Sequence, residues 1–227
     1  MNKKYLFLCM LSLTEENYLK NILILSESNE GVSVNALSNE LGVKMPTVNS
    51  MVKKLAEKKY VVFESYKPIY LTNLGKKEAA FILRKHRLTE TFLYKKMELG
   101  WEQVHPIAEQ IEHIQSELFF DKMDELLGHP SIDPHGEPIP TKEGKIIRHH
   151  YAKLSSCNVN AEVVFSSVAD VSESFLEYLN KRSLKLGMHL KILLKEPYDN
   201  SITIAYDGNK KEILSKVVCD KILVSTH

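Results

Sequence analysis

The protein has 227 residues, of which 44% are hydrophobic and 26% are charged, and its net charge is +1. This composition is that of an ordinary globular protein, and it excludes a collagen, a disordered chain and a polytopic membrane protein. The near-neutral total hides a basic first part, because residues 1–85 hold 13 basic and 8 acidic side chains. Residues 86–150 hold 7 basic and 12 acidic side chains and seven of the nine histidines. Basic segments favour polyanions, whereas acidic segments rich in histidine favour divalent cations.

The cysteines and the first residues bear on location. Cys9, Cys157 and Cys219 are widely spaced, which disfavours a disulfide framework and favours the reducing cytoplasm. The run from Met1 to Leu13 has the basic start and apolar stretch of a secretion signal, but no cleavage site follows, and Met10 is an alternative start. No other segment reaches the roughly 20 apolar residues of a membrane span. We therefore expect a cytoplasmic protein without a membrane partner.

A helix-turn-helix unit is predicted near the start of the chain. Apolar residues with helical spacing predict a helix from Thr14 to Ser26. A second helix is expected at Val34–Leu41, where Gly42 follows in the position of a C-terminal cap. Pro46 then begins a third helix that continues to about Leu55, since proline is favoured in a first helical turn. Two helices joined by a short turn with glycine form the DNA-binding helix-turn-helix.

A wing and a helical segment are expected next. Two β-rich runs at 60–64 and 69–72, separated by a short turn, predict a hairpin. After a helix-turn-helix, such a hairpin is the wing of a winged helix. A long helix is then predicted from about Lys76 to Met97, and another from Pro106 to about Leu127.

The last part of the chain is predicted to be a small β domain. It follows a linker at 141–155, and short apolar alternations with a single helix near 172–180 indicate an SH3-like barrel of about five strands. The alternations fall at Ala161–Phe165, Leu190–Leu194, Ser201–Tyr206 and Lys221–Val224. The predicted fold class is mainly α with a small β part. Its domains are a winged helix-turn-helix at 1–75, a helical domain at 76–150 and the SH3-like domain at 151–227.

The predicted helical domain carries metal-ligand spacings. Three carboxylates and three imidazoles recur at intervals of three and four on two helices, which places each set on one helix face. A solvated acidic face with incidental histidines is the alternative, but two sets in one segment favour a metal site. Oxygen and imidazole ligands without a thiol suit Mn²⁺ or Fe²⁺, and Zn²⁺ also binds them. The candidate ligands are His86, Glu90, His105, Glu109, Glu112 and His113.

The third helix and the wing carry the candidate DNA contacts. Threonine, asparagine and serine can read base edges, while lysine neutralises phosphates. The alternative is the solvated face of a winged helix that binds another protein. The candidate contacts are Lys44, Pro46, Thr47, Asn49, Ser50, Lys53 and Lys54 on the helix, with Tyr66 and Lys67 on the wing.

Three motifs accompany these features. They are Arg-Lys-His-Arg-Leu-Thr-Glu at 84–90, Val-His at 104–105 followed by Glu109-x-x-Glu112-His113, and Asp-Pro-His-Gly-x-Pro-Ile-Pro at 133–140. With the winged helix, they resemble the diphtheria toxin repressor family of metal-dependent transcriptional regulators, which includes the manganese transport regulator. The resemblance spans about residues 14–227, and its last part is similar to the ferrous-transport-associated SH3-like domain of longer members.

The resemblance implies a homodimer that binds operator DNA when metal-loaded, usually repressing metal-uptake genes. It implies a helical dimerisation domain, with Glu109, Glu112 and His113 in the primary metal site and a further ligand at Asn17. It assigns an ancillary site to the set His86, Glu90 and His105. A further ancillary ligand is expected from the β domain, at Glu173 or a neighbour.

Three departures from the family pattern bear on the metal. Asn17 stands where manganese-type members have Asp and iron-type members have Met, and Lys20 stands where manganese-type members carry an acidic residue. Glu109 stands where iron-type members carry Cys, so Mn²⁺ is favoured over Fe²⁺, and Zn²⁺ or Co²⁺ are expected to substitute in vitro.

Three functions of a different kind compete with this interpretation. A metal-dependent hydrolase would need a general base beside an open coordination position, and no separate candidate is present. There is no paired nucleophile and base, no HExxH motif and no phosphate-binding glycine loop. The second is a metal-storage helical protein, and the third is a protein-binding winged-helix module. We expect a regulator, not an enzyme, with no small-molecule substrate.

Overall fold

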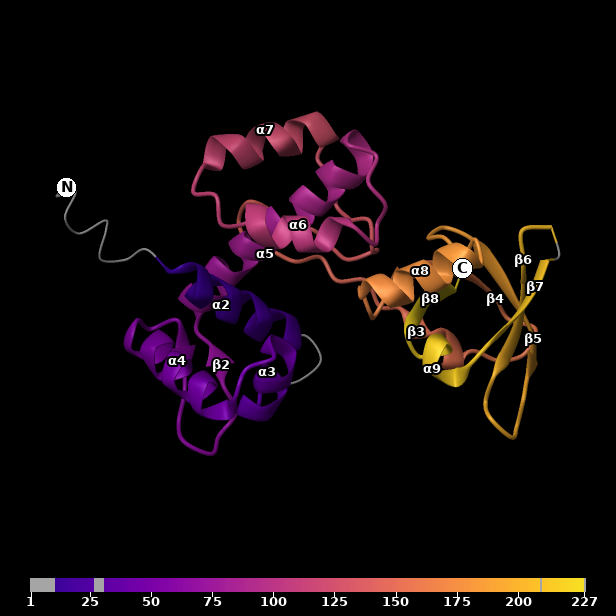
Figure 1. Ribbon diagram of the computed structural model, residues 1–227, viewed down its shortest axis with the longest axis horizontal. Coiled ribbons are helices and arrows are strands. Elements are labelled where there is room, and N and C mark those ends of the chain that lie inside the picture. Colours follow the sequence, from indigo (N-terminus) through magenta and orange to yellow (C-terminus); the bar gives the residue numbers. More distant parts are fainter. Residues whose placement is uncertain (1–10, 27–30, 209, 227) are drawn as a thin grey trace. The chain divides into compact units, whose positions relative to one another are not determined.

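The computed structural model of the protein describes residues 11–26, 31–208 and 210–226 (Figure 1). The apolar start of the chain, with Cys9 and Met10, lies outside the described residues. The chain divides into two compact units. One holds the residues up to His86 together with 110–117 and 140–146, and the other holds 87–109, 118–139 and the residues from 147 on. No helix in the described ranges is long and apolar enough to cross a membrane.

From residue 11 on, the described part of the first unit contains the helices α2 (Leu13–Ser26), α3 (Val34–Leu41) and α4 (Met45–Glu57). Ser12 caps α2, two residues before the predicted start of the helix at Thr14. Its hydroxyl accepts from the backbone N–H of Glu15, whose carboxylate accepts from the Ser12 N–H in return, which is a capping box. The expected ends of the other two helices are confirmed, since Gly42 caps α3 with φ of +63° and proline lies in the first turn of α4.

The predicted wing is a short antiparallel hairpin of β1 (Val61–Val62) and β2 (Tyr70–Leu71). It is tied to the turn before α3, because Val32 and Ile69 exchange both backbone hydrogen bonds at 2.9 and 2.8 Å. The helices and the wing share one apolar core. Its fully buried members include Leu19, Ile22, Leu37, Val48, Val52, Leu55 and Ile69.

The long helix α5 (Asn73–Lys96) begins three residues earlier than expected, close against the wing. A Cβ atom at Gly75 would lie 1.9 Å from the backbone oxygen of Tyr60. Only glycine allows this approach.

We therefore expect Gly75→Ala to lower the free energy of unfolding by about 1–3 kcal/mol, as overpacking does. Helix propensity alone predicts the opposite sign, since alanine is the better helix former. Urea unfolding of this variant beside the exposed-site variant Lys76→Ala measures the difference. An increase in stability on Gly75→Ala would refute the close approach.

The single helix predicted from Pro106 to Leu127 is wrong. The chain forms two helices, α6 (Val104–Ile111) and α7 (Glu117–Leu127), joined by a turn. No glycine or proline lies between positions 107 and 127 to signal the break. At the break, Glu112 is fully buried and bonded to residues distant in sequence.

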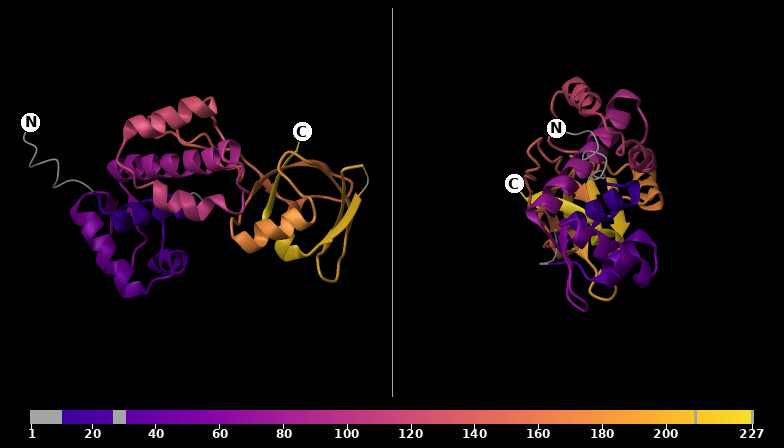
Figure 2. Two further views of the ribbon diagram at one scale, coloured as in Figure 1. Left: turned by 45° about the horizontal axis from the view of Figure 1, so that its top comes forward. Right: turned by 90° about the vertical axis from the view of Figure 1, so that its left-hand side faces the viewer.

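The C-terminal part contains one six-stranded antiparallel sheet in the order β3-β8-β4-β5-β6-β7. Figure 2 shows the strands of this part, in orange to yellow, together with its short helices. In chain order the elements are β3 (Ala152–Lys153), a 3-10 turn (Leu154–Ser156), β4 (Glu162–Val168), α8 (Glu173–Lys181), β5 (His189–Lys195), β6 (Ile202–Tyr206), β7 (Lys210–Leu214), α9 (Lys216–Cys219) and β8 (Ile222–Thr226). Both helices pack on the sheet, and Phe165, Leu176, Leu190 and Cys219 belong to one core.

The sheet confirms the SH3-like class but not a closed barrel. In the parts of the chain that the structure describes, the outer strands β3 and β7 do not pair with each other. The polar strand β7 was missed because its sequence, Lys-Lys-Glu-Ile-Leu, has little apolar alternation. The predicted linker at 141–155 ends in the short strand β3 and the 3-10 turn. The division at residues 75 and 150 remains a prediction.

Candidate functional site

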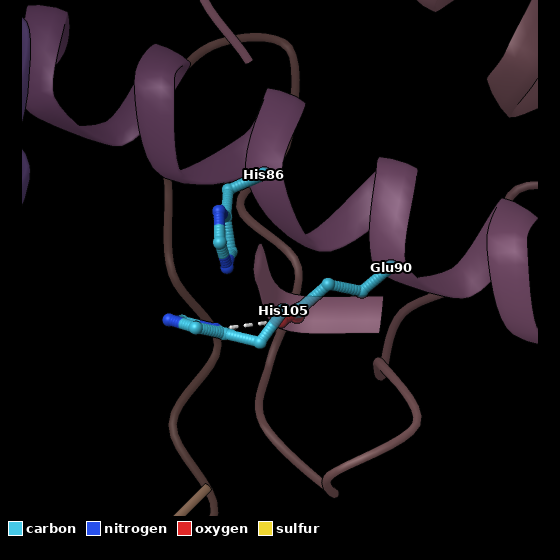
Figure 3. Close-up of side chains that lie close together, drawn as sticks. All are labelled: His86, Glu90 and His105. Carbon is cyan, nitrogen blue, oxygen red and sulfur yellow. Dashed lines mark hydrogen bonds and ion pairs between the residues drawn. The ribbon is translucent and has the colours of Figure 1, made fainter. Parts of the chain in front are cut away.

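The helix α5 presents the two residues from which the candidate metal site is built. His86 and Glu90 lie one helical turn apart, and 4% and 2% of their surfaces are exposed. His105, in the first turn of α6, has its Nδ1 3.0 Å from Glu90 Oε1, and its Nε2 lies 3.7 Å from Glu109 Oε1. Figure 3 shows His86, Glu90 and His105 close together, and their donor atoms lie within 4.8 Å of one another. The predicted ancillary residues are thus neighbours.

The second oxygen of Glu90 faces a pair of residues that were not among the predicted ligands. His135 Nδ1 lies 3.7 Å from Glu90 Oε2. Glu90, Asp133 and His135 are all buried, and their donor atoms lie within 4.8 Å of one another. The signal was present in the Asp-Pro-His-Gly motif, which identified the family without being assigned to the metal.

Backbone contacts hold this motif in place. Asp133 Oδ1 accepts from the backbone N–H groups of His135 and Glu137 at 2.8 and 2.9 Å. Gly136 has a φ of +87°, and a Cβ there would lie 2.1 Å from the backbone oxygen of Ser166. The glycine therefore lets the loop lie directly on β4.

The orientation of His135 suits a ligand. Its Nε2 donates to the backbone oxygen of Trp101 at 2.8 Å, so Nδ1 is the nitrogen that faces Glu90. A metal-binding histidine commonly donates its other ring N–H to a carbonyl in this way, which fixes the ring. The Trp101 ring also stacks on the imidazole, with centroids 6.2 Å apart.

Burial and nearby charges shift the pKa values of this group of side chains. Burial and the nearby Glu90 carboxylate raise the pKa of Asp133 to about 7, against the opposing effect of Arg87. Burial alone would lower the pKa of His135, but the hydrogen bond and charge of Glu90 raise it to about 9. Carboxylates and an imidazole gathered at this depth are typical of functional sites.

Glu112, one of the predicted primary ligands, pairs with a lysine. His86, Glu109 and Glu112 also offer donor atoms within 4.8 Å of one another. Lys20 Nζ lies 2.8 Å from each oxygen of Glu112, and His86 Nδ1 lies 2.5 Å from Glu112 Oε2. Burial alone would raise the pKa of Glu112, but His86 and Lys20 outweigh it and lower the pKa below its usual value. His113 Nε2 is 3.7 Å from Glu112 Oε1, while its Nδ1 is 2.6 Å from Glu16 Oε2. Lys20 and Glu16 were not among the predicted ligands.

The two groups of donors fit a divalent ion differently. Glu90 with His105, Asp133 and His135 offers oxygen and imidazole ligands, which is the donor chemistry of Mn²⁺ or Fe²⁺ sites, and the Arg87 guanidinium lies 3.5 Å from Asp133. Around Glu112, both carboxylate oxygens already bond a cation of the protein. Asn17, the other predicted primary ligand, has a side-chain oxygen on α2 that is buried without a hydrogen-bond partner.

The candidate DNA contacts lie largely on one exposed face. Lys44, Pro46, Thr47, Ser50 and Lys53 are exposed on or just before α4, while Asn49 is half-buried. Lys54 lies 3.4 Å from the buried Glu15 carboxylate, so it is tied to α2. On the wing, Tyr66 is fully exposed, and Lys67 pairs with Glu64 at 2.5 Å.

Glu173, the ligand expected from the β domain, is exposed at the start of α8. It belongs to none of the donor groups found in residues 11–26, 31–208 and 210–226.

A winged helix together with a buried carboxylate–imidazole cluster defines the class of metal-dependent DNA-binding regulators. The model for the N-terminal DNA-binding domain of iron dependent repressors matches residues 10–69, and the model for their metal-binding and dimerisation domain matches residues 72–141. The protein belongs to the iron-dependent repressor family, whose members are transcriptional regulators and not enzymes. This confirms the resemblance read from the motifs.

Relatives of both metal types match the chain. The iron-dependent repressor IdeR of Mycobacterium leprae is 32% identical over 127 residues, 56% of this chain and 55% of that repressor. That match therefore spans about half the length of the relative. The regulator MntR of Geobacillus thermodenitrificans is 32% identical over 112 residues, 49% of this chain and 79% of that regulator. A solved structure of a manganese-dependent transcriptional repressor in complex with manganese superposes with a TM-score of 0.87 at 29% identity, covering 94% of this chain and 100% of that chain.

Proposed function

We propose that the protein is a Mn²⁺-dependent repressor that binds operator DNA as a homodimer and controls metal-uptake genes. The observation that carries the proposal is the buried Glu90, whose two oxygens face His105 and His135 beside Asp133. A divalent ion there would be held by oxygen and imidazole donors. Its chemistry would be structural, holding the end of α5, α6 and the 133–136 loop in one arrangement.

The choice of Mn²⁺ over Fe²⁺ rests on the donors. Glu90 and Asp133 supply hard oxygen ligands, and no thiol belongs to the donor groups of the described residues. The manganese-bound relative supports the same choice. Fe²⁺ is the alternative, supported by the relatives that are named for iron.

The homodimer is supported by the helical segment. Residues 72–141 match the dimerisation domain of the family, and α7 exposes large apolar side chains at Leu118 and Leu126, with 70% and 63% of their surfaces accessible. Apolar side chains on one helix are the usual material of a two-fold interface. The two α4 helices of a dimer would contact two half-sites on the DNA. These half-sites would lie about one turn of the DNA helix apart, or a multiple of it.

Fluorescence anisotropy tests the proposal. The probe is a duplex selected by the Mn²⁺-loaded protein from a random-sequence pool, titrated in Mn²⁺ and in EDTA. We expect Mn²⁺ to tighten binding about 5–150-fold, which is the usual range of allosteric coupling. Fe²⁺ under anaerobic conditions should give a smaller effect. Equal affinity in Mn²⁺ and EDTA would rule out a metal-dependent repressor.

Lys53 is expected to contact a phosphate. Removing one such contact lowers the slope of log affinity against log salt concentration by about 0.9, because fewer counterions are released. We therefore expect Lys53→Ala to weaken binding to all duplexes and to flatten the salt dependence. Lys185→Ala, at an exposed position in the C-terminal part, is the control and should leave the slope unchanged. An unchanged slope for Lys53→Ala would remove this residue from the interface.

A further inference from the structure

Lys20 lies where a soluble protein rarely places a lysine. Only 2% of its surface is exposed, and its ammonium group bonds both oxygens of Glu112 at 2.8 Å. The Glu112 side chain is itself fully buried. A buried charge is tolerated when it is paired, and Lys20 and Glu112 form such a buried pair.

The surroundings of this ion pair have the composition of a cation site. Two imidazoles approach the same carboxylate, His86 at 2.5 Å and His113 at 3.7 Å. On α2, three residues before Lys20, the side-chain oxygen of Asn17 is buried and accepts no hydrogen bond. Carboxylate, imidazole and amide oxygen are donors that bind Mn²⁺, and here a lysine ammonium is the cation among them.

An ammonium that bonds both oxygens of Glu112 competes with a divalent ion for that carboxylate. Both need the carboxylate oxygens, and two cations a few ångströms apart in a buried site repel each other strongly. We propose that Lys20 is a built-in cation that takes the place of a metal ion at Glu112, so that the protein binds divalent metal at Glu90 but not at Glu112. This inference rests on the proposed function, because it assigns which donors hold the regulatory ion.

The consequence concerns α2, the first helix of the winged-helix unit. Lys20 on α2 bonds the segment at Glu112 with a side chain of the protein. The link from α2 to Glu112 therefore persists without metal. The regulatory ion then acts through Glu90 and its neighbours alone.

The test counts bound Mn²⁺ in the full-length protein by equilibrium dialysis and elemental analysis. Lys20→Glu, which replaces the ammonium by a carboxylate, is expected to bind one Mn²⁺ per chain more than the wild type. Lys58→Glu is the matched control, since Lys58 also pairs with a buried carboxylate, that of Glu15 at 2.7 Å, and it should leave the count unchanged. An unchanged count in a folded Lys20→Glu variant overturns the proposal.

A second variant decides the matter if Lys20→Glu does not fold. In the wild-type background, Glu112→Gln should leave the number of bound Mn²⁺ ions unchanged, although it removes the charge that Lys20 needs and should lower the melting temperature. Loss of one Mn²⁺ on Glu112→Gln would mean that Glu112 already binds metal, and the proposal would be wrong. Both counts are made without DNA. They therefore test metal binding at Glu112 independently of whether metal changes the DNA affinity of the protein.

Discussion

Glu90→Gln is expected to abolish regulatory metal binding. Glu90 is the only residue that belongs to both the His86–His105 group and the Asp133–His135 group in the described parts of the chain. An amide keeps the size of the side chain but offers one neutral oxygen instead of two charged ones. Replacing a residue that only hydrogen-bonds a metal ligand lowers metal affinity by about 10–100-fold. Replacing the ligand Glu90 itself should lower the affinity at least as much.

Isothermal titration with Mn²⁺ measures this loss. The control is Glu125→Gln, an exposed carboxylate on α7 that pairs with Lys122 and belongs to no donor group among the described residues. Its Mn²⁺ affinity should equal that of the wild type. If Glu90→Gln also binds Mn²⁺ as the wild type does, then Glu90 is not the centre of the site.

The second large effect is expected at Arg87, next to the site. Only 1% of its surface is exposed, and its guanidinium bonds the Glu137 carboxylate, lies 3.5 Å from Asp133 and donates to the backbone oxygen of Pro138 at 2.6 Å. Removing one partner from a buried ion network leaves the other charges uncompensated. We expect Arg87→Met to lower the free energy of unfolding by about 3–5 kcal/mol.

Urea unfolding in the absence of metal separates this effect from metal binding. Arg182→Met is the control, because Arg182 pairs with Glu212 at 3.0 Å but is partly exposed to solvent. Such a pair contributes about 0–1 kcal/mol. Equal losses for the two variants would show that the buried network around Arg87 does not stabilise the fold.

The winged helix was predictable because its signals are local. Gly42 caps α3 and a proline starts α4, and both act within a turn of their own position. The break between α6 and α7 was not predictable in this way. It accompanies the contacts of Glu112 with Lys20 and His86, which lie far away in the sequence.

The candidate site likewise contains residues that local sequence signals predict and residues that they do not. His86, Glu90 and His105 were found from helical spacing, which a sequence displays directly, and they are neighbours in the structure. Asp133 and His135 lie on an irregular loop, so no spacing rule connects them to Glu90. Lys20 stood out in the sequence only as a departure from the family pattern. Its ion pair with Glu112 spans 92 positions and became visible only in the fold.

The coupling between metal and DNA is tested most directly by measuring Mn²⁺ affinity twice, with the selected duplex at saturation and with a duplex of unrelated sequence. Coupling between two ligands is reciprocal, so DNA must tighten Mn²⁺ binding by the same factor by which Mn²⁺ tightens DNA binding. We predict equal factors in the range of about 5–150-fold for the wild type. An Mn²⁺ affinity that is the same with both duplexes would contradict the account.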